Sequence, residues 1–136
     1  PVATWGRPPQ LYNPADAAWT ADADRFAKAV DLWPALGSLD VLCGLGRYAV
    51  LVIGSDKGLL SAPRKKGTRI TFLKAYAEKN IKIQKWDTDA RSPTFGKPLV
   101  YRVTPSRVDT TGSRTIQDVP PVQAPFDVHA SHCIHV

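Results

Sequence analysis

The sequence predicts an α+β fold, with N-terminal helices followed by a mostly antiparallel sheet with long loops. In residues 16–43, apolar side chains recur at spacings of three and four, which is typical of helices. From residue 47 onward, short runs alternate apolar and polar side chains, and turn-forming residues separate these runs. The length of 136 residues predicts one domain, residues 1–136, with one modest core.

Two helices are predicted in the first third of the chain. The first covers residues 16–33, with Asp16 or Thr20 as its N-cap, and it ends or bends at Pro34, which cannot continue the helical hydrogen bonds. The second covers residues 35–43. Their apolar stripes, which we expect to pack in the core, consist of Phe26, Val30 and Trp33 and of Leu36, Leu39, Leu42 and Cys43.

The clearest strand is predicted over residues 47–54, because both of its alternating faces are apolar. A strand with two apolar faces belongs in the centre of a sheet. Gly44 or Gly46, in a left-handed conformation, is expected to end the preceding helix and to start this strand. The two faces consist of Tyr48, Val50 and Val52 and of Ala49, Leu51 and Ile53.

Three further strands are predicted, together with an extended segment at the end of the chain. In that final segment, residues 127–136, alternation places His129, Cys133 and His135 on one face and His132 on the other. The three strands cover residues 69–75, 81–86 and 99–103. Turns and loops are predicted over residues 56–58, 61–68, 91–98 and 104–125, and residues 76–80 are expected to form a turn or a single helical turn.

The net charge of +6 is concentrated in the middle of the sequence. Residues 46–114 carry fifteen basic and five acidic side chains, whereas the segments before and after each sum to −2. A basic region of this kind suits phosphate, an acidic partner subunit or water. The candidate residues for facing DNA or a partner are Arg64, Lys65, Lys66 and Arg69.

Glycines before the central strand invite a comparison with dinucleotide-binding loops. That motif needs G-x-G-x-x-G between a strand and a helix, so that the helix N-terminus can hold a pyrophosphate. Here Ala49 occupies the third glycine position, and the glycines precede a strand. The carboxylate pair Asp87 and Asp89 is typical of turn chemistry. We therefore assign no catalytic residue and no cofactor.

The C-terminal histidines offer two further hypotheses. His129, His132, Cys133 and His135 are all possible zinc ligands, but a structural zinc site usually draws on two separated ligand pairs, so no metal is assigned. His129 and Ser131 match the H-x-[T/S] unit of 2H phosphoesterases, which need two such units to place two histidines around a phosphate. Only one unit is present in this sequence.

Other sequence features bear on the protein's environment. Cys43 and Cys133 are expected to be free buried thiols, which fits a reducing compartment. No apolar run approaches the ~20 residues needed to cross a bilayer, so no membrane partner is expected. The sequence contains no Met and starts within loop-like sequence, so we expect it to be a piece of a longer chain.

Several blocks of the sequence resemble a class of tailed-bacteriophage portal proteins. Residues 46–54 (GRYAVLVIG) are similar to the G-R-[YF]-[AG]-x-L-x-[IL]-G segment of that class, and residues 4–9 (TWGRPP) to its T-W-x-x-P-P element. The remaining blocks follow in the expected order: 73–77 (LKAYA), 83–87 (IQKWD), 92–98 (SPTFGKP) and 127–136 (DVHASHCIHV). His132 departs from the family pattern, which has an arginine there.

The resemblance implies a structural role without catalysis. Portal proteins form dodecameric rings at one capsid vertex, through which double-stranded DNA is packaged and ejected. Their partners are the capsid protein, the terminase and head-completion proteins. The resemblance implies that this chain is a fragment of the wing region, without the stem and clip, and that it is assembled in the host cytoplasm and then resides in the virion.

Two other functions remain open at this point. The sequence pI near 9.6, with interspersed Tyr and Trp, also suits a small basic nucleic-acid-binding module. The His129 and Ser131 unit leaves a 2H-type phosphodiesterase, acting on a cyclic nucleotide, as a second alternative. Turnover of a cyclic dinucleotide that His129→Ala abolishes would favour that enzyme.

Overall fold

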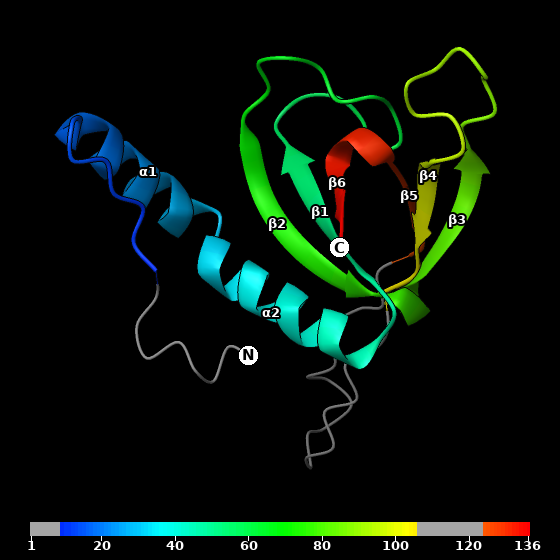
Figure 1. Ribbon diagram of the computed structural model, residues 1–136, viewed down its shortest axis with the longest axis horizontal. Helices are drawn as coiled ribbons and strands as arrows, with labels where there is room; N and C mark the ends of the chain where they lie inside the picture. The colour runs from blue at the N-terminus through cyan, green and yellow to red at the C-terminus, as the bar shows by residue number, and fades with distance from the viewer. Residues whose placement is uncertain (1–8, 106–123) are drawn as a thin grey trace.

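The structure, a computed structural model, describes residues 9–105 and 124–136 and has the predicted α+β class. Two helices precede two three-stranded antiparallel sheets (Figure 1). The helices are α1 (Ala17–Ala29) and α2 (Leu32–Leu45). The first sheet has the order β2 (Ile70–Ala77), β1 (Ala49–Ser55), β6 (Cys133–His135), and the second has the order β3 (Ile81–Trp86), β4 (Pro98–Val103), β5 (Phe126–His129).

The chain passes between the two sheets at two short 3-10 turns. Turn η2 (Glu78–Asn80) joins β2 to β3, and turn η4 (Ala130–His132) joins β5 to β6. Because β1 pairs with both β2 and β6, while β4 pairs with both β3 and β5, each bend carries the chain from an edge strand of one sheet to an edge strand of the other. We call the six strands the barrel.

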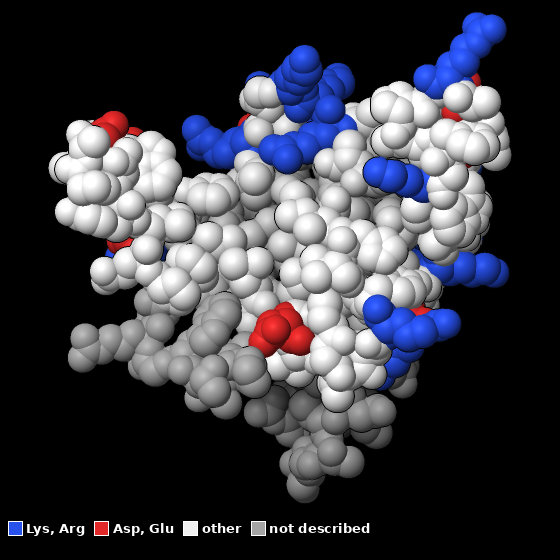
Figure 2. Space-filling view, viewed as in Figure 1, with Lys and Arg blue, Asp and Glu red and all other residues white. Residues whose placement is uncertain are grey.

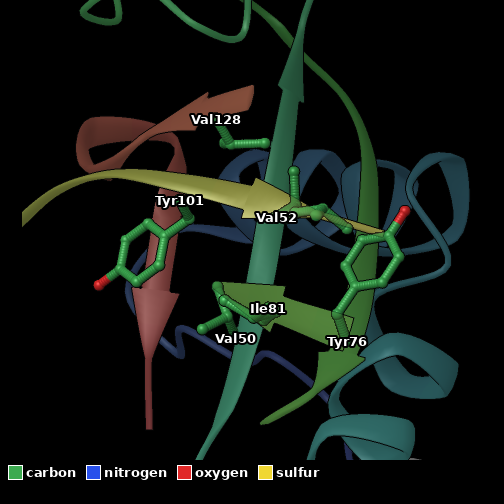
Figure 3. Packing of buried hydrophobic residues seen from close by; sticks show 7 residues of the cluster. Val50, Val52, Tyr76, Ile81, Tyr101 and Val128 are labelled. Carbon is green, nitrogen blue, oxygen red and sulfur yellow. The ribbon is translucent and has the colours of Figure 1, made fainter. Parts of the chain in front are cut away.

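Strand β1 is the centre of the structure, as predicted. Val50 and Val52 are fully buried on the face that points into the barrel, where Val128 of β5 also lies (Figure 3). Leu51 is buried on the opposite face, against Leu39 of α2. Burying a Leu or Val side chain contributes roughly 1.5–3 kcal/mol, so β1 stabilises both layers at once.

The helices differ from the prediction in where the first one ends. α1 stops at Ala29, and Asp31 adopts a left-handed conformation (φ 49°) between the two helices. Pro34 therefore lies in the first turn of α2, where the missing N–H breaks no helical hydrogen bond. The N-cap prediction is confirmed for Asp16, whose carboxylate accepts a hydrogen bond from the backbone N–H of Trp19 (2.9 Å).

The predicted left-handed glycine at the end of α2 is wrong. Gly44 lies inside the helix, and Gly46 is the C-cap with an extended backbone (φ −129°). The extended path continues because the backbone N–H of Arg47 donates to the Glu78 carboxylate (3.1 Å), which ties the start of the strand to η2. The prediction of a turn within residues 76–80 is confirmed by η2.

The predicted single extended segment over residues 127–136 is also wrong. The side chain of His129 accepts a hydrogen bond from the Ser131 N–H and caps η4, so the chain turns from one sheet into the other. His132 consequently points into the interior, with 1% of its surface exposed. Predictions for residues 1–8 and 106–123 fall outside the described part of the chain.

No helix within the described ranges is long and apolar enough to cross a membrane.

Candidate functional site

The four predicted basic residues lie in the loop between β1 and β2, and we call residues 56–69 the basic loop. Lys65, Lys66 and Arg69 are exposed, and Arg64 is half-buried. Figure 2 shows lysine and arginine side chains gathered over this loop, at the top of the view. Within residues 9–105 and 124–136, the ion pairs involve other basic residues, so these cations have no acidic partner: Arg25–Asp22, Lys28–Asp24, Arg47–Glu78 and Arg102–Asp127.

The basic loop is fixed at several points. The backbone N–H of Arg64 donates to the Ser131 hydroxyl (2.7 Å), and the backbone N–H of His129 donates to the Leu60 carbonyl (2.7 Å). Within the loop, the Arg64 guanidinium donates to the Thr68 hydroxyl (3.2 Å), which in turn donates to the Lys65 carbonyl (3.0 Å). Two features that the sequence presents separately, the basic cluster and the H-x-S unit, therefore meet in space.

The H-x-S unit acts as the anchor of this loop. Nδ1 of His129 lies 3.2 Å from the Ser131 backbone N and 2.9 Å from the Ser131 hydroxyl. A backbone N–H can only donate, so Nδ1 is an acceptor and the ring proton sits on Nε2. The Ser131 hydroxyl can then donate to Nδ1 while it accepts from Arg64. Burial, with a smaller effect of His132, lowers the pKa of His129, which favours this neutral form.

The other two histidines have packing partners of their own. Nδ1 of the buried His132 donates to the Ile53 carbonyl (3.2 Å), which ties η4 to β1. Nδ1 of His135 lies 3.0 Å from the Tyr101 hydroxyl, and its ring lies 4.8 Å from that of Tyr48. Because η4 turns the chain, His129, Cys133 and His135 do not share the single strand face that the sequence predicts.

These placements bear on the metal and thiol predictions. In the part of the chain that the structure describes, no three His, Cys, Asp or Glu side chains are close enough to hold a metal ion. Cys43 and Cys133 are free and half-buried. Burial raises the pKa of Cys133 to about 12, so its thiol stays protonated near neutral pH.

The carboxylate pair in the β3–β4 loop forms a turn, as expected. Asp87 accepts hydrogen bonds from the hydroxyls of Ser92 and Thr94, both at 2.6 Å, and from the Asp89 backbone N–H (3.0 Å). The hydrogen bonds from Ser92 and then Thr94 hold the pKa of Asp87 below its usual value. This carboxylate is therefore committed to loop structure.

Two exposed apolar features were not predicted from the sequence. On α1, Trp19 and Phe26 are 47% and 39% exposed, so the prediction that Phe26 packs in the core together with Val30 is wrong, whereas Val30 itself is buried. On β2, Phe72 is 43% exposed and lines a groove next to the basic loop. The alternation of Phe72, Lys74 and Tyr76 was a signal for the second feature, because every other residue of a strand lies on one face.

Comparison of the sequence with known protein families and with curated proteins found no match.

Proposed function

We propose that this chain is part of the wing region of a tailed-bacteriophage portal ring, through which DNA is packaged and ejected. The observation that carries the proposal is the apolar surface of α1, where Trp19 and Phe26 remain substantially in water. Aromatic side chains grouped on an exposed helix are typical of subunit interfaces. In a ring, the neighbouring subunit would cover them.

The positions of the portal-like blocks also support the proposal. The GRYAVLVIG block covers β1 up to Gly54, and the LKAYA block lies in its antiparallel neighbour β2. The DVHASHCIHV block covers β5 from Asp127 onward, η4 and β6, and β6 pairs with the other edge of β1. Blocks far apart in the sequence are therefore neighbours in the barrel, as expected for segments that maintain a shared structural frame.

Charge gives the ring a surface for DNA or an acidic neighbour. The basic loop combines five basic side chains with one acid, Asp56, whose carboxylate accepts from the Arg69 backbone N–H (3.0 Å). Contacts of such a loop with phosphate would be independent of DNA sequence and sensitive to salt. The proposed partners are other copies of this chain in a dodecamer, the capsid protein, the terminase and head-completion proteins, at the portal vertex of the virion.

Native mass spectrometry of the full-length gene product tests the assembly. We expect a closed oligomer for the natural protein and a monomer for the double variant Trp19→Asp/Phe26→Asp. Phe95→Asp is the matched control, because Phe95 is 58% exposed on a loop of the barrel and its variant should assemble normally. A natural protein that stays monomeric at every concentration would contradict the proposal.

Charge reversal tests the DNA contact. Replacing Arg64, Lys65, Lys66 and Arg69 by Glu should reduce the DNA packaged per phage particle, whereas reversing Lys79 and Lys82, at the η2 end of the barrel, should have a smaller effect. Unchanged packaging in the first variant would argue against a DNA-facing loop. The same cations favour a second function, a monomeric nucleic-acid-binding module, which would show salt-dependent DNA binding without any oligomer.

A further inference from the structure

A groove of about 740 Å³ lies beside the basic loop. One wall is formed by residues 58–61 of that loop, and the floor by Phe72, Lys74 and Tyr76 of β2. Phe126 and Asp127, at the start of β5, form the remaining wall. The groove therefore joins an aromatic floor to the most basic loop of the molecule.

The Phe72 ring packs directly over a glycine of the neighbouring strand. Its cross-strand partner is Gly54, and a Cβ atom built on Gly54 would lie 2.1 Å from the Phe72 ring. The ring therefore occupies the space that any other residue at position 54 would fill. With 43% of Phe72 still exposed, the ring is supported from below and open towards the groove. This arrangement resembles a flat platform on which another ring can stack.

The other groove residues continue this pattern. The Tyr76 ring packs edge-on against Phe126, with their centroids 6.2 Å apart, and the Lys74 ammonium lies 5.6 Å from the centre of the Tyr76 ring. Asp127 contributes little free negative charge, since it forms an ion pair with Arg102 through contacts of 2.8 and 3.1 Å. The groove thus combines aromatic rings with the Lys74 ammonium, and residues 58–61 connect it to the basic loop.

We propose that this groove binds single-stranded nucleic acid, with one base stacked on Phe72 and the backbone phosphates held by Lys74 and the basic loop. Aromatic platforms next to cations recognise single strands without strong sequence preference, because every base has a face that can stack. A duplex hides those faces inside its own stack. The inference therefore goes beyond the proposed portal role, in which the DNA is double-stranded.

Fluorescence anisotropy of a labelled oligothymidylate tests the proposal on the full-length protein. We expect binding that weakens with salt, with a log–log slope of about −0.7 per phosphate contact. Phe72→Ala should weaken binding about tenfold, the effect expected for one stacked base. Lys74→Glu should also weaken binding. Phe95→Ala is the matched control, since Phe95 is exposed but lies outside the groove, and its affinity should not change.

Phe72→Trp keeps the test decisive if Phe72→Ala unfolds. This variant retains an aromatic platform, so it should bind at least as tightly as the natural protein. The stacked base should quench the fluorescence of the introduced tryptophan. Three results would each overturn the inference: equal affinity for Phe72→Ala in a folded protein, tighter binding to a duplex of the same length, or absence of binding to the single strand at low salt.

Discussion

Strand β1 and helix α1 differ in how far their large apolar side chains are buried. Val50, Leu51 and Val52 of β1 are buried on both faces of the sheet. By contrast, Ala27 is the buried residue of α1, while its large side chains, Trp19 and Phe26, stay in contact with water. Figure 1 shows α1 to one side of the strands, connected to them through α2. The barrel and α2 together bury both faces of β1. Helix α1 instead presents an apolar surface that another molecule can cover.

The interior of the barrel also satisfies its polar groups. Among the described residues, each buried side-chain nitrogen and oxygen atom has a hydrogen-bond partner. His132 is the clearest case, because its ring is buried and yet bonded to the Ile53 carbonyl. A buried polar group without a partner would cost about 1–3 kcal/mol, so this completeness supports a single well-defined arrangement. The basic loop is therefore held by strands with a well-defined structure.

The largest expected effect on stability is the difference between truncating a buried leucine and truncating an exposed one. Leu51 on β1 is 2% exposed, whereas Leu45 at the end of α2 is 81% exposed. Leu51→Ala should lower the free energy of unfolding by about 2–5 kcal/mol, because it leaves a cavity between sheet and helix. Leu45→Ala should change it by less than about 0.5 kcal/mol. Urea denaturation measures both, and similar values would remove the distinction between core and surface.

A second, smaller effect on stability tests the close packing of the Phe72 ring against Gly54. Gly54→Ala should destabilise the protein by about 1–3 kcal/mol, because the new methyl group collides with the Phe72 ring. Much of this loss should disappear in the Phe72→Ala background, where the ring is absent. A double-mutant cycle measured by urea denaturation gives the coupling between the two positions.

Gly44 provides the control for that cycle. Gly44 lies inside α2, and apart from its chain neighbours and the backbone of the helix itself, a Cβ atom there meets no atom within 4 Å. Gly44→Ala should therefore stabilise the protein by about 0.5–1 kcal/mol, since alanine favours helix more than glycine does. If both alanine variants changed stability equally, the close approach of Phe72 to Gly54 would not be supported.

The smallest effect is a pH dependence of the free energy of unfolding, caused by His129 of the H-x-S unit that anchors the basic loop. The pKa of His129 in the folded protein is below its ordinary value of 6.5, because burial and then His132 disfavour its charge. Its contribution to stability is therefore present above about pH 6.5 and is lost as the pH falls through the folded pKa. Thermal unfolding should show a lower free energy of unfolding at about pH 5 than at about pH 7.5.

An asparagine variant isolates this effect. Asn is a favourable cap residue that can accept the Ser131 N–H but does not titrate, so His129→Asn should keep η4 while it flattens the pH dependence. A variant whose stability varies with pH as steeply as that of the natural protein would show that His129 is not the group responsible.

Sequence periodicity predicted the elements that depend on burial alone. The doubly apolar run around Leu51 identified the central strand, and the helical stripes identified two helices. Periodicity could not locate η4, because that turn depends on one hydrogen bond between the His129 side chain and the Ser131 backbone. Nor could it show the left-handed Asp31, which ends α1 although the apolar stripe continues.

The site was less predictable than the fold, for a related reason. The basic cluster was visible as a local run, and the structure keeps Lys65 and Lys66 exposed. The groove, however, depends on the register that places Gly54 opposite Phe72 and on the packing of residues from β5 next to β2. Contacts between segments so far apart in the sequence leave no local pattern, so the platform became apparent only in the folded chain.

Hydrogen exchange of backbone amides tests most directly whether β1 is already stable in the monomer while α1 becomes stable only in contact with a neighbouring copy. In a dilute, monomeric sample, the amides of α1 should exchange about a hundredfold faster than those of β1, because local opening is easiest where few contacts are buried. On raising the protein concentration, α1 should become protected while β1 stays unchanged. Equal protection of α1 and β1 in the monomer, or no gain in α1 on concentration, would contradict this account.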